Sequence, residues 1–240
     1  MPELPLAIVT GASTRLGRAF ALTLARRGLA VLLHYHQNFQ GANETAEEIR
    51  ALHIPVYLQQ ADLTLPEQVE ELFGQVDTLS HPLKVLVNSA ALMNRANIRE
   101  LTSAEWDLTM ALNLRAPFLC AQQAGLRMQE GGLIVNISDV AAHKTWHVFP
   151  AYSVSKAALE SLTRILARSF APQVRVNSIA PGLVLRSDIV SEGQWEALAA
   201  RLPLQRPAAL GEVTAALEYL LDNHYITGDT LLVDGGYSLI

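Results

Sequence analysis

Residues 4–17 read LPLAIVTGASTRLG, an apolar run that ends in a glycine-containing turn and leads into a helical pattern. Glycines in such a turn let backbone N–H groups approach a pyrophosphate at the positive end of the following helix. Gly11 and Gly17 are only two glycines in eight residues, so a tight strand-to-helix turn without a ligand stays open as an alternative. The stretch predicts the first strand and the first helix of a nucleotide-binding α/β fold.

Six further apolar runs follow the first one. Together the seven runs cover residues 4–10, 30–35, 54–59, 84–89, 132–138, 174–180 and 230–234, and they are rich in Val, Ile and Leu. Such continuous runs are typical of parallel strands buried on both faces. Patterns that begin near residues 15, 41, 66, 104, 151, 192 and 211 predict helices between them. We therefore predict a Rossmann-like, doubly wound parallel sheet of about seven strands with helices on both faces. No internal repeat or linker divides residues 1–240, which predicts a single domain.

The composition excludes several classes of protein. The chain has 240 residues, of which 50% are hydrophobic and 17% charged, and its net charge is −5. This length can bury a large core, and the lack of a basic surplus argues against nucleic acid as the main partner. No window reaches about 18 uninterrupted apolar residues, so we expect no membrane span. Cys120 is the only cysteine, which excludes an internal disulfide framework and leaves no cysteine pair for zinc. We therefore expect a cytoplasmic protein without a metal that acts on a small-molecule substrate.

Tyr152 and Lys156 lie four residues apart in a helical pattern, so their side chains project from one face of the helix. A neighbouring ammonium favours tyrosinate and lowers the pKa of the phenol. Bringing that pKa from about 10 to near neutrality takes about 4 kcal/mol. The pair predicts a proton donor that works at physiological pH.

Taken in chain order, the motifs resemble those of the short-chain dehydrogenase/reductases. The resemblance covers the whole chain and rests on the glycine turn, Asn88-Ser89-Ala90-Ala91, Asn113, Tyr152-x-x-x-Lys156 and Pro181-Gly182. It implies that Asn113 supports Lys156 through water and that Asn88 lies on the adenosine side of the cofactor. It also implies that Asp62 and Leu63 meet the adenine and that the protein is a homotetramer. The cofactor-binding residues predicted in this way are Gly11, Ser13, Arg15, Leu16, Gly17, His36, Gln37, Asn38, Asp62, Leu63, Asn88, Ala90, Tyr152, Lys156, Pro181 and Gly182.

Two departures from the common family pattern concern the cofactor. Arg15 stands where most members carry a second glycine, which would place a guanidinium beside the bound phosphates. The second predicted strand runs into His34-Tyr35-His36-Gln37-Asn38 without the acid that binds the ribose of NAD and repels a 2′-phosphate. NADPH is therefore the predicted cofactor, and both features are similar to those of pteridine reductases.

The resemblance to pteridine reductases is incomplete at the phosphate site. Gln37 stands where an arginine is common in those enzymes, so the phosphate would rely on Arg15, His36, Asn38 and backbone amides. Packing at the end of the strand is the alternative for His34 and His36.

A third departure concerns the chemistry. Asp139 lies thirteen residues before Tyr152, where the family usually places a serine that donates to the substrate oxygen. Ser138 cannot replace it, because neighbouring side chains of a strand point to opposite faces. An ionised carboxylate about 4 Å from the oxyanion formed in ketone reduction would repel it by about 4 kcal/mol, roughly a thousandfold in rate. Reduction of a C=N bond instead needs a proton on nitrogen, which a carboxyl group can help to relay. Pteridine reductases are similar in carrying aspartate here. The alternative is that Asp139 points to solvent or caps the end of the strand.

These features lead to a hypothesis for the function. We predict an NADPH-dependent reductase of a pterin-like heterocycle, of the dihydropterin or dihydrofolate type, with Asp139, Tyr152, Lys156 and Asn113 as catalytic residues. The predicted substrate pocket contains Met93, Asp139, Trp146 and Leu183; Met93 lies near a position where pteridine reductases commonly have a phenylalanine. One alternative is an NADPH-dependent carbonyl reductase, such as a 3-oxoacyl-carrier-protein reductase or a sugar or alcohol dehydrogenase. A non-catalytic nucleotide-binding protein is the other.

Overall fold

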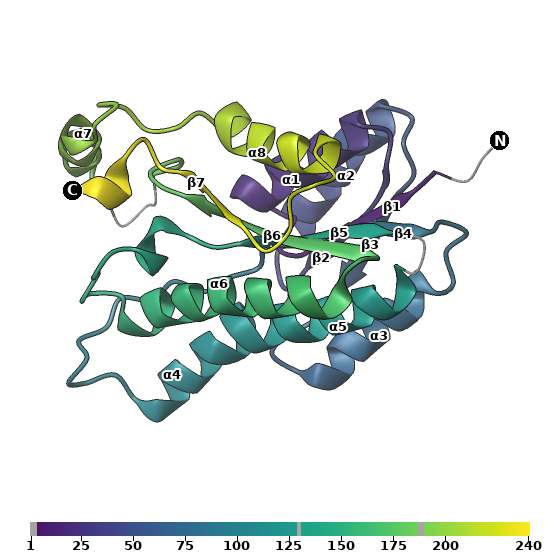
Figure 1. The fold of residues 1–240 in the computed structure, drawn as a ribbon, viewed down its shortest axis with the longest axis horizontal. Helices are drawn as coiled ribbons and strands as arrows, with labels where there is room; N and C mark the ends of the chain where they lie inside the picture. Colours follow the sequence, from purple (N-terminus) through teal and green to yellow (C-terminus); the bar gives the residue numbers. More distant parts are fainter. Residues whose placement is uncertain (1–3, 129–130, 187–189) are drawn as a thin grey trace.

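The computed structural model describes residues 4–128, 131–186 and 190–240, and within them seven strands form one parallel sheet (Figure 1). The strands are β1 (Leu6–Val9), β2 (Ala30–Tyr35), β3 (Val56–Gln60), β4 (Leu83–Asn88), β5 (Gly132–Ile137), β6 (Val174–Pro181) and β7 (Thr230–Val233). All seven predicted strands are confirmed. Their ends differ from the prediction by at most two residues, because a buried parallel strand is readable as a continuous apolar run.

The order of the strands defines where a ligand can bind. It is β3-β2-β1-β4-β5-β6-β7, so the chain winds outward from β1 to β3 and then returns to the other side of β1 with β4. The neighbours β1 and β4 therefore form the switch point of the sheet. In open α/β sheets the crevice beyond the carboxyl ends of the strands at this point is the usual binding site.

Helices cover both faces of the sheet, as predicted (Figure 1). They are α1 (Arg15–Arg26), α2 (Phe39–Ala51), α3 (Pro66–Val76), α4 (Ser103–Met110), α5 (Ala116–Arg127), α6 (Pro150–Phe170), α7 (Glu192–Arg201) and α8 (Leu210–Asp222). On one face, Phe20 of α1 and Leu217 of α8 are buried in the core. On the other face, Phe73 of α3 and Cys120 of α5 are buried. These four helices thus bury their apolar sides against the sheet, and Cys120 is a core residue.

A break between α4 and α5 was not predicted. The sequence predicts a helix from about residue 104, whereas the structure has a π-helical turn at Ala111–Arg115 between α4 and α5. Asn113 lies in this turn. Wide turns of this kind are rare, are not visible as a change in apolar periodicity, and are frequent at functional sites.

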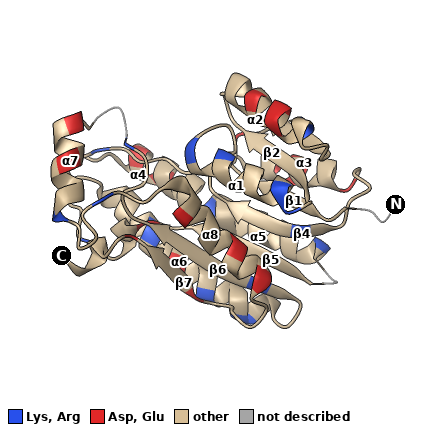
Figure 2. Cartoon of the chain, turned by 90° about the horizontal axis from the view of Figure 1, so that it is seen from above, with Lys and Arg blue, Asp and Glu red and all other residues tan. Residues whose placement is uncertain are grey.

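Charged residues lie mainly on helices and loops, and the strands are almost entirely tan in Figure 2. This distribution agrees with strands that are buried on both faces. Among the residues that the structure describes, no helix is both long and apolar enough to cross a bilayer.

Candidate active site

The turn between β1 and α1 depends on its glycines. Gly11 has a φ angle of 65°, in the left-handed region that glycine adopts without strain. A Cβ atom on Gly17 would lie 2.1 Å from the carbonyl oxygen of Gly11, so only glycine lets α1 begin so close to the turn. The turn therefore places the N-terminus of α1 at the carboxyl end of β1, where the backbone can hold a phosphate.

His34 of β2 holds the glycine turn in place. The backbone N–H of Gly11 donates to His34 Nδ1 at 3.1 Å, and Nε2 lies 3.0 Å from the carbonyl oxygen of Ala61. Because Nδ1 accepts and a carbonyl can only accept, the proton must be on Nε2. The ring is buried, and desolvation lowers the pKa of His34 to about 4. His34 is thus a neutral packing residue at the end of its strand, the alternative left open by the sequence.

The loop after β4 is tied to the end of β1. The hydroxyl of Thr10 accepts from the backbone N–H groups of Ser89 and Ala90 at 2.9 and 3.1 Å. Asn88 is buried, and its amide donates to Asn136 Oδ1 at 2.9 Å. The side chain of Asn88 therefore links β4 to β5 inside the sheet, while Ala90 lies at the crevice beside the glycine turn.

Three reactive groups meet beyond β5. The phenol of Tyr152 donates to Asp139 Oδ2 at 2.9 Å. Lys156 Nζ lies 5.6 Å from the centroid of the Tyr152 ring. Asp139 Oδ1 accepts from the backbone N–H of Ala141 at 2.7 Å and so caps the 3₁₀ turn Val140–Ala142. The carboxylate therefore shares the site with the phenol and the amine and caps a turn at the same time.

Burial shifts the pKa values of these three groups. It raises the pKa of Asp139, and together with the charge of Asp139 it raises the pKa of Tyr152 well above its usual value. Desolvation lowers the pKa of Lys156 to about 8, although Asp139 acts in the opposite direction. The prediction that Lys156 lowers the pKa of Tyr152 is therefore wrong for this arrangement. The phenol is bonded to a carboxylate, whereas the Lys156 ammonium donates to the carbonyl oxygen of Ile137 at 2.7 Å.

Asn113 connects the π-helical turn to both sides of the site. Its Oδ1 accepts from the backbone N–H of Leu92 at 2.8 Å. Its Nδ2 donates to the carbonyl oxygen of Leu92 at 2.9 Å and to Ser155 Oγ at 3.0 Å. Asn113 thus joins the loop after β4 to α6 at the residue before Lys156, which makes it a positioning residue. The predicted support of Lys156 through water stays a prediction.

A second polar cluster lies behind the site. The hydroxyl of Ser138 points away from Tyr152, as its place in the strand predicts, and donates to Glu160 Oε1 at 2.8 Å. His143 Nε2 lies 3.0 Å from the same oxygen. Glu160 is 7% exposed and follows Lys156 by one helical turn. The sequence analysis missed this cluster, although an acid on the apolar face of a helix is a usable signal.

Asp62 and Leu63, which were predicted to meet the adenine, differ in their contacts and burial. Asp62 Oδ1 accepts from the backbone N–H and the hydroxyl of Thr64 at 2.9 and 2.7 Å. The Thr64 hydroxyl is the main cause that lowers the pKa of Asp62. The side chain of Leu63 is buried in the core, so only its backbone can meet an adenine. His36 is exposed, and its Nε2 lies 3.9 Å from Asp62 Oδ2.

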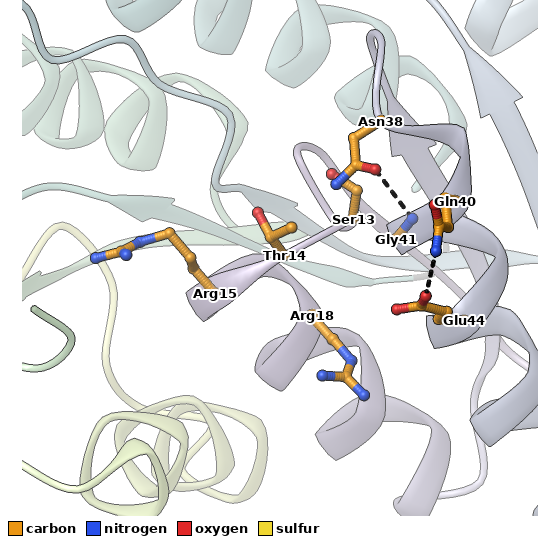
Figure 3. Close-up of a pocket in the computed structure, with 8 residues that line it drawn as sticks. All are labelled: Ser13, Thr14, Arg15, Arg18, Asn38, Gln40, Gly41 and Glu44. Carbon is orange, nitrogen blue, oxygen red and sulfur yellow. Dashed lines mark hydrogen bonds between the residues drawn. The ribbon is translucent and has the colours of Figure 1, made fainter. Parts of the chain in front are cut away.

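A small polar cavity of about 280 Å³ lies between the glycine turn and the start of α2, with Ser13 and Asn38 in its lining (Figure 3). Asn38 Oδ1 accepts from the backbone N–H of Gly41 at 3.0 Å and caps α2. Arg15 contributes to the cavity wall, but its guanidinium turns away and donates to the carbonyl oxygen of Leu185 at 2.8 Å. His36 and Gln37 are not among the described residues that line the cavity. In this structure neither the Arg15 guanidinium nor His36 points into the cavity, and their predicted role in holding a phosphate stays a prediction.

Of the remaining predicted residues, Pro181, Gly182 and Leu16 were assigned to the cofactor and Leu183 to the substrate pocket. Pro181 ends β6, and the backbone N–H of Gly182 donates to the carbonyl oxygen of Val233 at 3.0 Å. Leu183 is half-buried, and its carbonyl oxygen accepts from the N–H of Ala208 at 2.8 Å. Leu16 is half-buried and packs against the core beside α1. Gly182 and Leu183 thus take part through backbone groups, whereas Leu16 takes part through a packed side chain.

The end of the site nearest Asp139 carries aromatic side chains. The half-buried ring of Trp146 lies 5.8 Å from the ring of Tyr237, between centroids. Burial raises the pKa of Tyr237, and the charge of Asp139 contributes in the same direction, so the two side chains lie within electrostatic range. Met93 is 42% exposed. Tyr237 was not predicted as a pocket residue, because 91 positions separate it from Trp146 in the sequence.

The arrangement fits a dinucleotide. The glycine turn, the N-terminus of α1 and the polar cavity follow the carboxyl ends of β1 and β2, where the phosphates and the adenosine half of a dinucleotide bind. The group formed by Asp139, Tyr152 and Lys156 lies further along the same edge, beyond β5. A nucleotide cradle and a proton-donating site in one crevice are the parts that a dinucleotide-dependent oxidoreductase needs.

Comparison with known proteins identifies the family. Residues 11–238 match a family model described as "Enoyl-(Acyl carrier protein) reductase". A 1-cyclohexenylcarbonyl-CoA reductase of Streptomyces collinus is 36% identical over 98% of this chain and 87% of its own length. A 3-oxoacyl-[acyl-carrier-protein] reductase FabG of Staphylococcus aureus (strain Mu50 / ATCC 700699) is 31% identical over 96% of both chains. The protein therefore belongs to this family, within the short-chain dehydrogenase/reductases.

Solved structures agree with this assignment. The FolM alternative dihydrofolate reductase 1 from Brucella canis, complexed with NADP, has a TM-score of 0.93 and 33% identity over 98% of this chain and 94% of its own. A blue fluorescent protein from a metagenomic library, in complex with NADPH, has a TM-score of 0.90 and 30% identity over 98% of both chains. These cofactor-bound neighbours bear out the prediction of an NADP-type cofactor.

Proposed function

We propose that this protein is an NADPH-dependent reductase that acts on a C=N bond of a pterin-like heterocycle, of the dihydropterin or dihydrofolate type. The observation that carries the proposal is the hydrogen bond of 2.9 Å between the phenol of Tyr152 and Asp139 Oδ2. It puts a carboxylate next to the proton donor, where most of the family has a serine. The edge of a pterin carries N–H groups, and a carboxylate is a strong acceptor for such donors. The similarity to a structure named alternative dihydrofolate reductase supports the same substrate class.

The chain's residues divide the work between cofactor and substrate. NADPH, when bound, supplies the hydride that goes to the carbon of the C=N bond. The glycine turn and Ser13 would hold its phosphates, and Lys156 its ribose. Asp139 would orient the heterocycle, and Asn113 keeps α6 in register with the loop after β4.

The pKa shifts assign the protons at neutral pH. Tyr152 keeps its phenolic proton, because its pKa lies well above the usual value. When a substrate nitrogen lies within hydrogen-bond reach of Tyr152 Oη, the phenol donates that proton to it. Lys156, with a pKa of about 8, holds a proton that it can release near neutral pH. Asp139 accepts the hydrogen bond of the phenol and so orients it toward the substrate.

The alternative function is reduction of a ketone in an acyl thioester. It is favoured by the relatives named as a CoA-thioester reductase and a 3-oxoacyl-[acyl-carrier-protein] reductase. An ionised Asp139 opposes it, because hydride addition to a ketone leaves a negative oxygen beside Tyr152 Oη. The repulsion at about 4 Å is about 4 kcal/mol, or roughly a thousandfold in rate.

Oxidation of NADPH by the wild type and by Asp139→Ser, with dihydrofolate, dihydrobiopterin and a 3-oxoacyl thioester as substrates, distinguishes the two functions. We expect the wild type to reduce the dihydropterin-type substrates, and Asp139→Ser to lower their kcat/KM by about a hundredfold. The same variant should raise any activity on the thioester, because the repulsive charge is gone. Asp107→Ser is the matched control, because Asp107 is exposed on α4.

The outcomes separate the candidates. Wild-type turnover of the thioester alone would overturn the pterin assignment in favour of a carbonyl reductase. Binding of NADPH without oxidation by either class would favour the non-catalytic alternative. Asp139, Tyr152 and Lys156 lie close together in one site, which argues against that last outcome.

A further inference from the structure

The polar cavity of Figure 3 lies where the ribose of the adenosine half is recognised. It is formed between the turn after β1, which contributes Ser13 and Thr14, and the start of α2, which contributes Gln40 and Glu44. In dinucleotide-binding folds, the groups beyond the second strand select between a free 2′-hydroxyl and a 2′-phosphate. An arginine near this place accommodates the phosphate, and an acid favours the hydroxyl.

An arginine expected for a 2′-phosphate is missing after the second strand. Gln37, two residues beyond the end of β2, stands where an arginine is common in pteridine reductases. The guanidinium of Arg15 points away from the cavity and bonds to the loop after β6. A phosphate in this cavity therefore needs another positive charge.

Arg18 of α1 provides one. It lines the cavity, and its side chain is 40% exposed. Arg18 Nε is buried, and among the described residues it has no hydrogen-bond partner. One terminal nitrogen pairs with Glu48 of α2, and this contact holds the guanidinium at the junction of the two helices. A guanidinium has five donors, so the ion pair leaves others for a phosphate oxygen.

Glu44 opposes this charge within the same cavity. It lies on α2 and accepts from Gln40 Nε2 at 3.1 Å. A 2′-phosphate carries more than one negative charge near neutral pH, so this carboxylate weakens its binding. A 2′-hydroxyl carries no charge and is little affected.

We propose that Arg18 and Glu44 together set the preference of this protein for a nucleotide with a 2′-phosphate, Arg18 by attraction and Glu44 by repulsion. Neither residue was expected from the sequence, and neither contacts the groups that carry out the proposed reaction. The assignment concerns nucleotide selection alone and holds for any substrate.

Isothermal titration calorimetry with adenosine 2′,5′-bisphosphate and with 5′-AMP tests the proposal without turnover. We expect Arg18→Met to weaken binding of the bisphosphate by about ten- to hundredfold, the range for a hydrogen bond to a charged group. Binding of 5′-AMP should change by less than about twofold, which also shows that the variant is folded. Glu44→Gln should strengthen binding of the bisphosphate about three- to tenfold, because a repulsive charge is removed.

The control variant is Arg50→Met. Arg50 forms a similar exposed pair with Glu47 on α2, outside the cavity lining. It should leave both affinities unchanged. Equal weakening of both ligands by Arg18→Met, or the same effect from Arg50→Met, would overturn the role of Arg18. An unchanged affinity for the bisphosphate in Glu44→Gln would overturn the opposing role of the carboxylate, even if Arg18→Met failed to fold. Since no substrate is present, these results are independent of the pterin assignment.

Discussion

Replacing Asp139 by asparagine should lower the pKa of Tyr152 and leave the site otherwise similar in shape. In the native site the phenol donates to a carboxylate oxygen at 2.9 Å, so ionisation of Tyr152 would place two negative charges side by side. The charge of Asp139 and its hydrogen bond both raise the pKa of Tyr152, in addition to burial. Asparagine keeps an acceptor oxygen for the phenol and removes the charge.

The size of the effect follows from the distance. Two unit charges 2.9 Å apart repel by about 6 kcal/mol at an effective dielectric constant of about 20, which corresponds to about 4 pKa units. Relaxation of the surroundings reduces this value, so we expect a fall of about 2 to 4 units. The pKa of Lys156 should fall below about 8 in the same variant, because Asp139 raises it in the native site.

Ultraviolet titration of tyrosinate measures the shift. The chain has six tyrosines, so each titration is compared with the same protein carrying Tyr152→Phe, and the difference reports Tyr152 alone. The pH profile of kcat should move in the same direction, because Tyr152 is the proposed proton donor. A Tyr152 pKa that stays the same or rises in Asp139→Asn would refute the electrostatic coupling on which the proton assignment rests.

Three further predictions concern the turn, the buried histidine and the assembly. Gly17→Ala should destabilise the fold by about 1–3 kcal/mol and weaken NADPH binding, because its Cβ would lie 2.1 Å from a backbone oxygen. Thermal melting and cofactor titration check this, with Gly74→Ala, which meets nothing within 4 Å, as the control that should not lose stability. His34 has a folded pKa of about 4 against 6.5 when exposed, so the wild type should lose about 3 kcal/mol of stability as pH falls from 6.5 to 4. Urea unfolding of His34→Asn should lack this acid-dependent loss, whereas the exposed-site variant His224→Asn should retain it; equal slopes for all three would contradict the assignment. Sedimentation should show particles of about four times 26.2 kDa, since Leu239 and Ile240 expose apolar surface near the end of the chain; particles of one chain only would exclude the tetramer.

The strands could be predicted because a buried parallel strand appears in the sequence as a continuous apolar run. A strand covered by helices on both faces is mostly apolar, and seven such runs are visible in the sequence without any long-range information. The glycine turn is local in the same sense, since it joins one strand to the next helix within eight residues. The π-helical turn at Ala111–Arg115 could not be predicted in this way, because one wider turn hardly changes the spacing of apolar residues along a helix.

Short sequence motifs also identified the reactive groups, but they did not predict which of these groups contact one another. Strand alternation correctly separated Asp139 from Ser138, and the structure directs the first to Tyr152 and the second to Glu160. The sequence analysis assigned Lys156 as the group that tunes Tyr152. Whether an ammonium or a carboxylate bonds a phenol depends on distances between separate elements, which spacing along one helix does not report.

The amino-acid sequence by itself determined the doubly wound sheet, the glycine turn and the presence of an acid, a phenol and an amine at one edge. These features depend on apolar periodicity and on residue types at short separations. Only the tertiary structure decided that burial makes His34 neutral, that Arg15 and Arg18 both line the polar cavity although the Arg15 guanidinium bonds to Leu185, and that Tyr237 meets Trp146. The physical reason is that desolvation, charge pairing and side-chain direction are set by neighbours that are distant in the chain and become adjacent only when the helices pack on the sheet.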